Sequence, residues 1–472
     1  MVYRKYRLSG GLTEEDLKNI HREILVVLEK IGVEIDHPAI LAFLAGQKGI
    51  EVKGKRVHYD RKLVEDFIPQ IKQQNAEYSY NRKGEEKFRM LPPYMGRYYT
   101  DIDTGETRLA TLNDCIAAVK LCDSYQMYGP SPIHLQTVPV HLRQVATEKV
   151  CVENSREMGG WCVAENIKEA DLMCRIGQVS GRKPPYCALE IPISPLRLNH
   201  NCLDVIYQNR NHQYNLSGIC LGGGAAPMPG ASAPIFFPGM LVQGMAEALA
   251  AYITPKLIDP EVYGYCSFGG FIFDVRKMQP AKPFPESILY CLAVSQVIKY
   301  VLGEKFGVDF ACNINSLSDV FRVAFALGMG ICDGATSVIG IGGDSSGTGG
   351  ELDGFNPVMA VIQADIVRHC ERFAGGLKLD EEKGISLKVI EEAIYTGMPN
   401  SFLDHPTTLQ HREIYLEPEL FFKFSGEELK EKARETARKK IAEHNFSLPG
   451  DKREAIEKIY READRTLGKK PG

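Results

Sequence analysis

The stretch GICLGGGAAPMPG, residues 218–230, decides the fold class. It begins as a short apolar run typical of a buried β-strand and changes abruptly into a glycine-rich loop. A helical apolar pattern follows over residues 238–253. A strand, a loop and a helix in this order form one βα unit, the building block of parallel sheets.

The same unit recurs along most of the chain. Apolar, often β-branched runs predict strands at 131–137, 159–164, 186–191, 216–221, 262–268, 308–313 and 336–341. Helical patterns alternate with them at 141–156, 166–180, 200–213, 238–253, 285–302, 318–330 and 357–374. With a further strand near Tyr98–Ile102, these units number about the eight of an α/β TIM barrel. An open doubly wound sheet is the alternative; we favour the (β/α)8 barrel because no unit carries the Rossmann glycine pattern at its first turn.

Both flanks of this region have a different character. An amphipathic helix is predicted over 13–31, followed by a strand pair within Ile50–Tyr59 that turns at Gly54, and by a second helix over 61–73. The tail from residue 383 is helical and highly charged. We therefore expect an N-terminal helical cap at 1–96, the barrel at 97–382, and a C-terminal helical extension at 383–472 packed on the barrel.

Composition narrows the class of protein. The net charge is -4 over 472 residues with a pI near 6.3, which argues against nucleic-acid or membrane-surface binding through bulk charge. No apolar run is long enough to cross a membrane, and the first residues do not resemble a signal peptide. Thirteen cysteines are scattered without a CxxC pair, which favours a reducing cytoplasm.

Two glycine-rich loops follow predicted strands, at 218–230 and 340–355. The second contains Asp344, Glu351 and Asp353 and no basic residue, so it suits a cation better than a phosphate. A phosphate cradle, a cation or zwitterion site and plain loop geometry all stay open.

Aromatic and acidic residues near the strand ends are the candidate site residues. Ring faces bind a quaternary ammonium group, which has no hydrogen to donate. The candidates are Tyr98, Tyr99, Glu190, Phe355, Asp344 and Glu351, with Phe268, Phe271 and Asn315 as weaker ones. Each ring could instead belong to the core. Glu190, inside the apolar run YCALEIPISPL (186–196), could contact a substrate cation, act as an acid or base, or form a structural ion pair with an arginine.

The sequence does not indicate a metal site or a serine-hydrolase site. There is no HExxH, EF-hand or other defensible metal-ligand spacing, so no metal is expected. There is also no GxSxG nucleophile elbow.

Several blocks together resemble the trimethylamine methyltransferase family. They are LTEEDLKNIHREILVVLEKIGVEIDHP (12–38), DIDTGETRLATLND (101–114), GGGAAPMPGASAPIFFPGMLVQGMAEALA (222–250), PESILYCLAVSQVIKYV (285–301) and FLDHPTTLQHREIYLEPELF (402–421). The resemblance spans nearly the whole chain in the same order. It implies a TIM barrel and methyl transfer to the Co(I) corrinoid of a partner protein.

The region around 343–353 carries no pyrrolysine, so the chain resembles the non-pyrrolysine branch, several members of which demethylate quaternary amines. The resemblance thus implies a betaine-type substrate such as glycine betaine, proline betaine, carnitine or γ-butyrobetaine. A quaternary nitrogen leaves as a neutral tertiary amine, so no catalytic residue of the chain's own and no tightly bound cofactor is expected; cobalamin comes with the partner protein. A zinc-dependent barrel methyltransferase and a non-catalytic betaine-binding protein are the alternatives. Homo-oligomerisation and the particular amine stay open.

Overall fold

Eight segments of the chain lie side by side as parallel strands or single parallel bridges. The computed structural model describes residues 11–81, 89–94, 96–222, 224–270, 272–276, 278–281, 286–303, 310–311, 337–344, 354–374, 387–395, 402–403, 405–410, 420 and 423–468. The strands are β4 (Arg89–Leu91), β7 (Cys187–Glu190), β10 (Ile219–Gly222), β12 (Tyr263–Gly264), β16 (Phe310–Ala311) and β17 (Ser337–Ile339). Segments 128–134 and 158–164 join them through bridges at Gly96↔Ile133, Gly129↔Met158 and Val163↔Ala188.

Neighbouring segments follow one another in the sequence, and the last of them, β17, pairs with the first, β4. The segments run β4, 128–134, 158–164, β7, β10 and β12, while β16 pairs with β17 and β17 pairs with β4. The backbone N–H of Tyr128 donates to the carbonyl of Met90 at 3.3 Å, which places segment 128–134 beside β4. Between β12 and β16 the described residues record no pairing, so the chain is a mixed α/β protein whose barrel closure stays a prediction.

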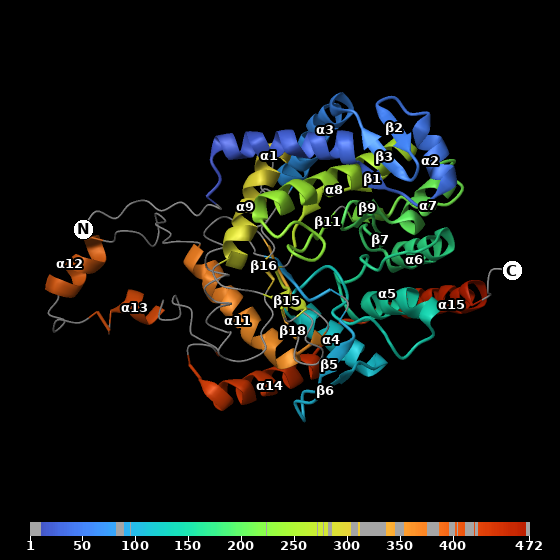
Figure 1. Cartoon of the computed structure of the whole chain (residues 1–472). Helices are drawn as coiled ribbons and strands as arrows, with labels where there is room; N and C mark the ends of the chain where they lie inside the picture. The colour runs from blue at the N-terminus through green and yellow to red at the C-terminus, as the bar shows by residue number, and fades with distance from the viewer. Residues whose placement is uncertain are drawn as a thin grey trace.

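Helices connect most of these segments and cover them (Figure 1). They are α4 (Leu112–Ser124), η2 (Val140–Leu142), α5 (Arg143–Asn154), α6 (Ile167–Ser180), α7 (His200–Gln208), α8 (Phe237–Ile258), α9 (Glu286–Leu302) and α11 (Pro357–Ala374). Helix α8 is apolar on every side and is buried accordingly. Gly244 lets α8 approach the sheet, because a Cβ there would stand 2.5 Å from the ring of Phe268.

Side chains alternate along each strand between two sides. One side packs against the helices and forms the hydrophobic core, and the other side, called inward below, faces away from the helices. Cys187, Leu189 and Ile191 belong to the hydrophobic core between strands and helices, so Ala188 and Glu190 take the opposite side of the ladder. The same alternation places Leu221 in that core. The sequence predicted the strands at 186–191 and 216–221 correctly because these apolar runs are continuous.

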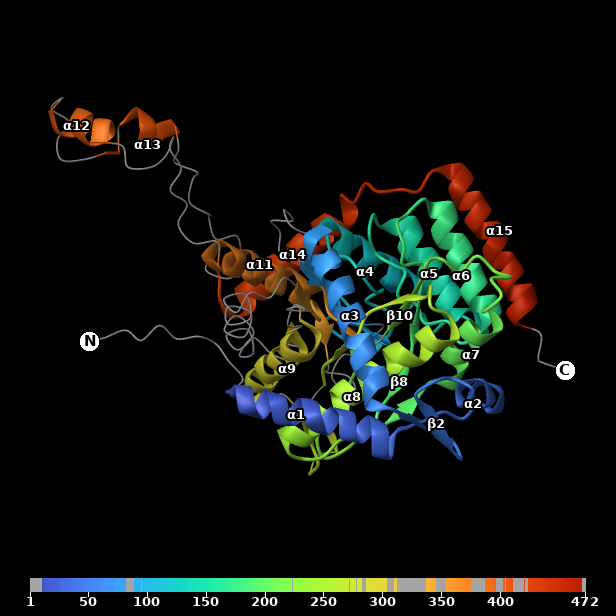
Figure 2. The ribbon, with the colours of Figure 1, turned by 90° about the horizontal axis from the view of Figure 1, so that it is seen from above.

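The N-terminal unit has the predicted helix, strand pair and second helix, together with elements that were not predicted, β1 and α2. The elements are α1 (Glu14–Val26), a π-helical turn η1 (Val27–Ile31), β1 (Val33–Glu34), α2 (Pro38–Ala45), β2 (Ile50–Lys53), β3 (Arg56–Tyr59) and α3 (Arg61–Asn81). Thr13 and Asp16 form a capping box that begins α1. Helix α1 lies along α8 and α9 (Figure 2). Strand β1 also pairs with β9 (Arg197–Leu198), which forms a hairpin with β8 (Pro192–Ile193), so the unit is joined to the chain directly after β7.

Several predicted elements differ from the structure. The strand predicted near Tyr98–Ile102 is present as β5 (Tyr98–Thr100), but its place as the eighth strand was wrong. It pairs with β6 (Thr107–Leu109) and β19 (Gly354–Phe355), and β4 takes the place beside β17. The runs at 131–137 and 159–164 form single bridges rather than ladders, and the run at 262–268 splits into β12 and β13 (Ser267–Phe268). Helix α4 was not predicted, and the helix predicted at 318–330 lies outside the described residues. These segments are short or begin at turns, where an apolar pattern gives little signal.

Four further strands complete the sheets. Strand β18 (Gly343–Asp344) pairs with β19 in the sheet that holds β5 and β6, β11 (Gly224–Ala225) pairs with β13, and β14 (Ile272–Asp274) forms a hairpin with β15 (Gln279–Ala281). No described helix is both long and apolar enough to cross a membrane. The described cysteines are free thiols, most of them buried.

The C-terminal helices α14 (Gly426–Ala442) and α15 (Gly450–Leu467) pack on the helical layer. Helix α14 contacts α11 and α4, and α15 runs along α5 and α6 (Figure 2). The shorter helices α12 (Leu387–Tyr395) and α13 (Pro406–Gln410) stand apart from the other helices in Figures 1 and 2.

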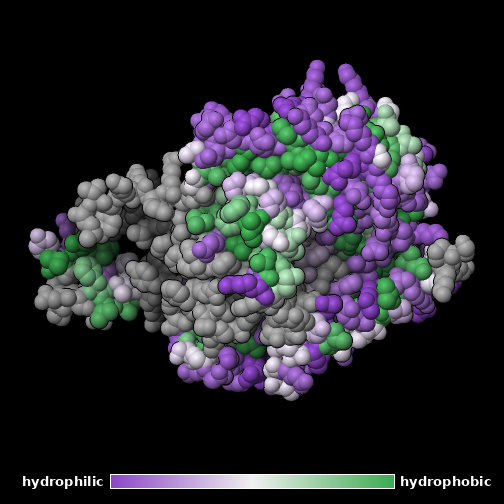
Figure 3. Space-filling view, viewed as in Figure 1, coloured by the Kyte–Doolittle hydropathy of each residue, from purple (hydrophilic) through white to green (hydrophobic). Residues whose placement is uncertain are grey.

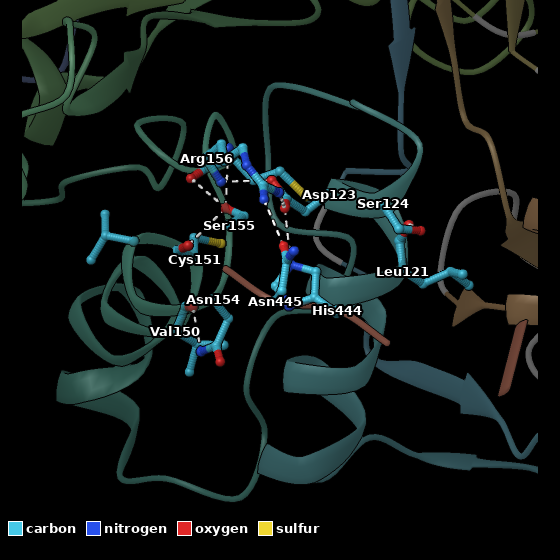
Figure 4. A network of polar contacts seen from close by, with 12 residues as sticks. Leu121, Asp123, Ser124, Val150, Cys151, Asn154, Ser155, Arg156, His444 and Asn445 are labelled. Carbon is cyan, nitrogen blue, oxygen red and sulfur yellow. Dashed lines mark hydrogen bonds and ion pairs between the residues drawn. The ribbon is translucent and has the colours of Figure 1, made fainter. Parts of the chain in front are cut away.

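A buried polar network fixes the link between α14 and α15 (Figure 4). The carboxylate of Asp123 lies 2.9 Å from His444 Nε2, and it accepts hydrogen bonds from the backbone N–H of Arg156 at 2.6 Å and from the Arg156 guanidinium. That guanidinium also donates to Asn445 Oδ1 at 3.0 Å. Because Asp123 and His444 are nearly fully buried, this network attaches the C-terminal extension firmly to the ends of α4 and α5.

Candidate functional site

Glu190 stands at the carboxyl end of β7, on the inward side of the ladder. Its side chain keeps access to solvent, although protein surrounds it closely enough that burial raises the pKa of the carboxyl above its usual range. The carboxyl group is therefore both open to solvent and closely surrounded by protein, and the space beside it is called the recess below. The adjoining strand β10 ends in glycine: a Cβ on Gly222 would stand 3.4 Å from the Glu190 side chain. The glycine therefore leaves the space beside the carboxyl open.

Tyr94 lies beside this carboxyl group, and two further aromatic residues, Trp161 and Tyr265, are near Tyr94. Tyr94 follows β4, Trp161 lies in segment 158–164, and Tyr265 lies between β12 and β13. The Tyr94 hydroxyl donates to the backbone carbonyl of Trp161 at 2.9 Å, and the rings of Trp161 and Tyr265 are 6.3 Å apart between centroids with their planes at 55°. All three rings are partly exposed and lie outside both hydrophobic core clusters.

Tyr94 connects the aromatic group to the acid. Burial and the nearby Glu190 carboxylate raise the pKa of the Tyr94 hydroxyl, so it stays protonated. The adjacent Tyr94 hydroxyl lowers the pKa of Glu190 and offsets part of the effect of burial. Within the described residues no arginine pairs with Glu190, so the structural ion pair considered for it is not found there. The carboxyl group keeps hydrogen-bonding capacity for a ligand.

Two loops beside Glu190 are fixed by one buried acid on α8. Glu247 has no exposed surface and accepts hydrogen bonds from the Ser194 hydroxyl at 2.6 Å and the Leu196 backbone N–H at 2.8 Å. Gln243 donates to Glu247 at 2.8 Å and to the carbonyl of Ser232 at 2.7 Å. Helix α8 thereby holds the loop after β7 and the loop after β10 together, which makes the recess rigid.

A second buried acid supports the segment that carries Trp161. Glu148 of α5 accepts a hydrogen bond from the backbone N–H of Gly160 at 2.8 Å. Burial raises the pKa of Glu148 to about 7, and Arg182 partly opposes that shift. Arg182 itself donates to the carbonyls of Met158 and Ser155. This network sits behind the recess and fixes the backbone on which Trp161 stands.

The other residues selected from the sequence have different positions. Tyr98, Tyr99, Phe355 and Asp344 come together in the sheet β18-β19-β5-β6, which follows β17 and β4. The Phe355 side chain has no exposed surface, and Tyr99 is almost fully buried beside Arg108, with 5.8 Å between ring centroid and guanidinium carbon. Their contact with a substrate stays a prediction.

The remaining candidates lie in the core or outside the described residues. Phe268 packs in the hydrophobic core against α8, on the helix side of β13. Glu351, Phe271 and Asn315 lie outside the described residues, as does the turn of the acidic loop.

The sequence analysis did not select Tyr94, Trp161 or Tyr265. One signal was present: Trp161 is the single tryptophan of the chain and follows Gly159 and Gly160 at the start of the strand predicted at 159–164. Tyr265 could be separated from Phe268 only by the alternation along β12 and β13, because odd and even positions face opposite sides.

No cluster of three or more His, Cys, Asp or Glu side chains suited to a metal ion occurs in the described part of the chain. The recess instead combines one carboxyl group with three ring faces. In this combination electrostatic attraction to the carboxylate and to the negative faces of the rings favours an organic cation.

The fold and these residues define the class: a mixed α/β protein in which Glu190, at the carboxyl end of β7, and the neighbouring rings form a candidate site suited to a small organic cation. The model of the family "Trimethylamine methyltransferase (MTTB)" matches residues 1–447. The chain therefore belongs to the trimethylamine methyltransferase family.

Curated relatives carry two activities. The chain is 24% identical over 310 residues to a glycine betaine methyltransferase of Desulfitobacterium hafniense strain Y51, covering 61% of this chain and 62% of that protein. It is 24% identical over 308 residues to a trimethylamine methyltransferase, MttB, of D. hafniense strain DSM 10664 / DCB-2, covering 62% of this chain and 60% of that protein. It is also 25% identical over 231 residues to MttB of Methanosarcina thermophila, covering 48% and 45%. The alignments with the first two span about three fifths of the relatives' own length.

Proposed function

We propose that this protein is a methyltransferase that takes a methyl group from a small quaternary amine of the betaine type and passes it to the Co(I) corrinoid of a partner protein. The observation that carries the proposal is the recess formed by Glu190, Tyr94, Trp161 and Tyr265. We further propose that the eight parallel segments close into a (β/α)8 barrel with this recess at its carboxyl end, where the active sites of such barrels lie.

The recess suits a substrate that is already positively charged. A quaternary nitrogen keeps the electron pair of the broken C–N bond and leaves as a neutral tertiary amine, so no proton has to be delivered. The acceptor supplies the electron pair for the new carbon–cobalt bond. What the chain has to do is hold the ammonium group, direct one methyl toward the acceptor and exclude water. Glu190 and the rings of Trp161 and Tyr265 hold the cation, and Tyr94 fixes the carboxyl.

The acceptor has to approach from the open end of the recess. The loops after β10 and β13 carry exposed apolar side chains there: Ile235, Phe236, Val275 and Met278. Ile235 and Val275 adjoin, since a Cβ on Gly230 would lie within 2.9 Å of both. Figure 3 shows hydrophobic residues gathered near the middle of this side of the molecule. We propose these loops as the contact for the corrinoid protein, with cobalamin carried by that partner and no tightly bound cofactor in this chain. The free thiols are compatible with a reducing cytoplasm as the place of the reaction.

The test is a methyl-transfer assay with the purified chain, reduced cobalamin and, in a second arm, a corrinoid protein from the same organism. Formation of methylcobalamin is followed by absorbance with glycine betaine, proline betaine, carnitine, γ-butyrobetaine and trimethylamine. Methylation with a quaternary amine supports the proposal. Tight binding of a betaine without any methylated corrinoid indicates a binding protein, and activity only after addition of zinc indicates the zinc-dependent class.

A further inference from the structure

A second polar cluster, formed by His134, Gln136 and Arg143, carries positive charge, whereas the recess at Glu190 is acidic. Ile133 and Leu135 of the segment after Gly129 belong to the hydrophobic core, so His134 takes the other side. On the adjacent segment, Cys162 and Ala164 belong to the core, so Trp161 likewise faces inward. His134 thus faces the same interior space as Trp161 and Glu190.

This cluster contains hydrogen-bonding atoms that have no partner. His134 Nε2, Arg143 Nε and Gln144 Oε1 are all buried and make no hydrogen bond. His134 Nδ1 lies 3.4 Å from Gln136 Nε2, and one Arg143 amine donates to the carbonyl of Gln136 at 3.4 Å. An unpaired buried polar atom is unfavourable, so His134 Nε2 and Arg143 Nε, whose side chains meet at Gln136, indicate a polar group that belongs beside them.

The charge of this group follows from its neighbours. Arg143 is a permanent cation, and no carboxylate within the described residues forms an ion pair with it. Other arginines of this half of the chain are engaged: Arg108 pairs with Asp114 at 2.6 Å, and Arg182 donates to backbone carbonyls. Arg143 is also the first residue of α5, whose N-cap Leu142 supplies no side-chain hydrogen bond. A guanidinium beside an imidazole at a helix start favours an anion with two oxygens.

We infer that His134 and Arg143 form a carboxylate subsite that completes the substrate pocket, so that the preferred substrate is a zwitterion rather than a simple cation. The inference rests on the proposed function. Glu190 and the rings bind the quaternary nitrogen, and Arg143 and His134 bind the carboxylate of the same molecule. The two poles fix both ends of a betaine and so determine which methyl group faces the opening.

The experiment compares a zwitterion with a cation that lacks the carboxylate. Binding of glycine betaine, γ-butyrobetaine and tetramethylammonium to the full chain is measured by calorimetry. For Arg143→Gln we expect the affinity for the best betaine to fall about ten- to hundred-fold, while tetramethylammonium binding changes less than about two-fold. Arg197→Gln is the matched control, because Arg197 is an exposed arginine of strand β9. It should leave both affinities unchanged.

A second variant guards against loss of fold. His134→Phe keeps the volume of the ring and removes its hydrogen bonds, and it should lower betaine affinity about three- to ten-fold with tetramethylammonium again unaffected. Equal effects on both ligands in both variants, or no effect on betaine, would overturn the subsite. A wild-type chain that binds tetramethylammonium but no betaine would also overturn it and leave the cation site standing. A wild-type chain that binds none of the three ligands would refute the proposed function itself.

Discussion

Replacement of Glu190 by glutamine should lower the affinity for a quaternary amine without lowering the stability of the fold. A carboxylate about 4 Å from a cation contributes about 4 kcal/mol at an effective dielectric constant of about 20, typical of a site near the surface. Part of this is offset, because burial raises the pKa of Glu190 and so disfavours its charged form. We therefore expect a net loss of about 1–3 kcal/mol, an increase in Kd for a quaternary amine of roughly 5- to 150-fold.

The same substitution should not weaken the fold. Since the folded-state pKa of Glu190 is raised, the protein holds the proton more tightly than the unfolded chain does, and the charged form at neutral pH is destabilising. Glutamine keeps the shape and removes that charge. The melting temperature of Glu190→Gln should be equal to or above that of the wild type, while the affinity falls.

The assay uses the single tryptophan of the chain. Trp161 faces Tyr265 at 6.3 Å between ring centroids, and a cation can lie within about 6 Å of both, so its binding should change the Trp161 fluorescence. Glu454→Gln is the control, because Glu454 is an exposed carboxylate on helix α15, away from the parallel strands. An unchanged Kd in Glu190→Gln, or an equal loss in Glu454→Gln, would refute the reasoning.

Three further predictions concern the partner surface and the supporting networks. Phe236→Asp should slow methyl transfer to the corrinoid protein but not to free cobalamin. It should not destabilise α8, because Phe236 is the N-cap of this helix and aspartate is a favoured N-cap residue. Ile31→Asp is the control, because Ile31 is an exposed apolar residue of the N-terminal unit. Burial raises the pKa of the Glu148 carboxyl from 4.5 to about 7, so the free energy of unfolding should fall by up to about 3 kcal/mol as the pH rises through that range. Urea unfolding of Glu148→Gln should not show this fall. Parallel pH profiles of the two proteins would contradict the prediction. Asp123→Ala should lower the free energy of unfolding by about 3 kcal/mol, because His444 and Arg156 lose a buried partner, and a change below about 1 kcal/mol would show that the C-terminal link is held by other contacts.

Several strands and helices, and one residue of the candidate site, could be predicted from the order of residues alone. Continuous apolar runs at 186–191 and 216–221 predicted β7 and β10, and the helical pattern from residue 13 predicted α1 with its cap at Thr13. Glu190 was selected because burying a carboxylate within an apolar strand is unfavourable unless the carboxylate has a partner. Such signals are local, so one chain segment is enough to reveal them.

The composition of the recess was decided by tertiary structure. Whether Tyr265 or Phe268 faces the substrate depends on the side of a strand that meets α8, and no local pattern marks that side. Tyr94 and Trp161 are 67 residues apart and meet only because their segments are neighbours in the parallel ladder. The sequence determined which residues could attract a cation, and packing decided which of them share one space, because proximity between distant residues arises only when strands and helices assemble.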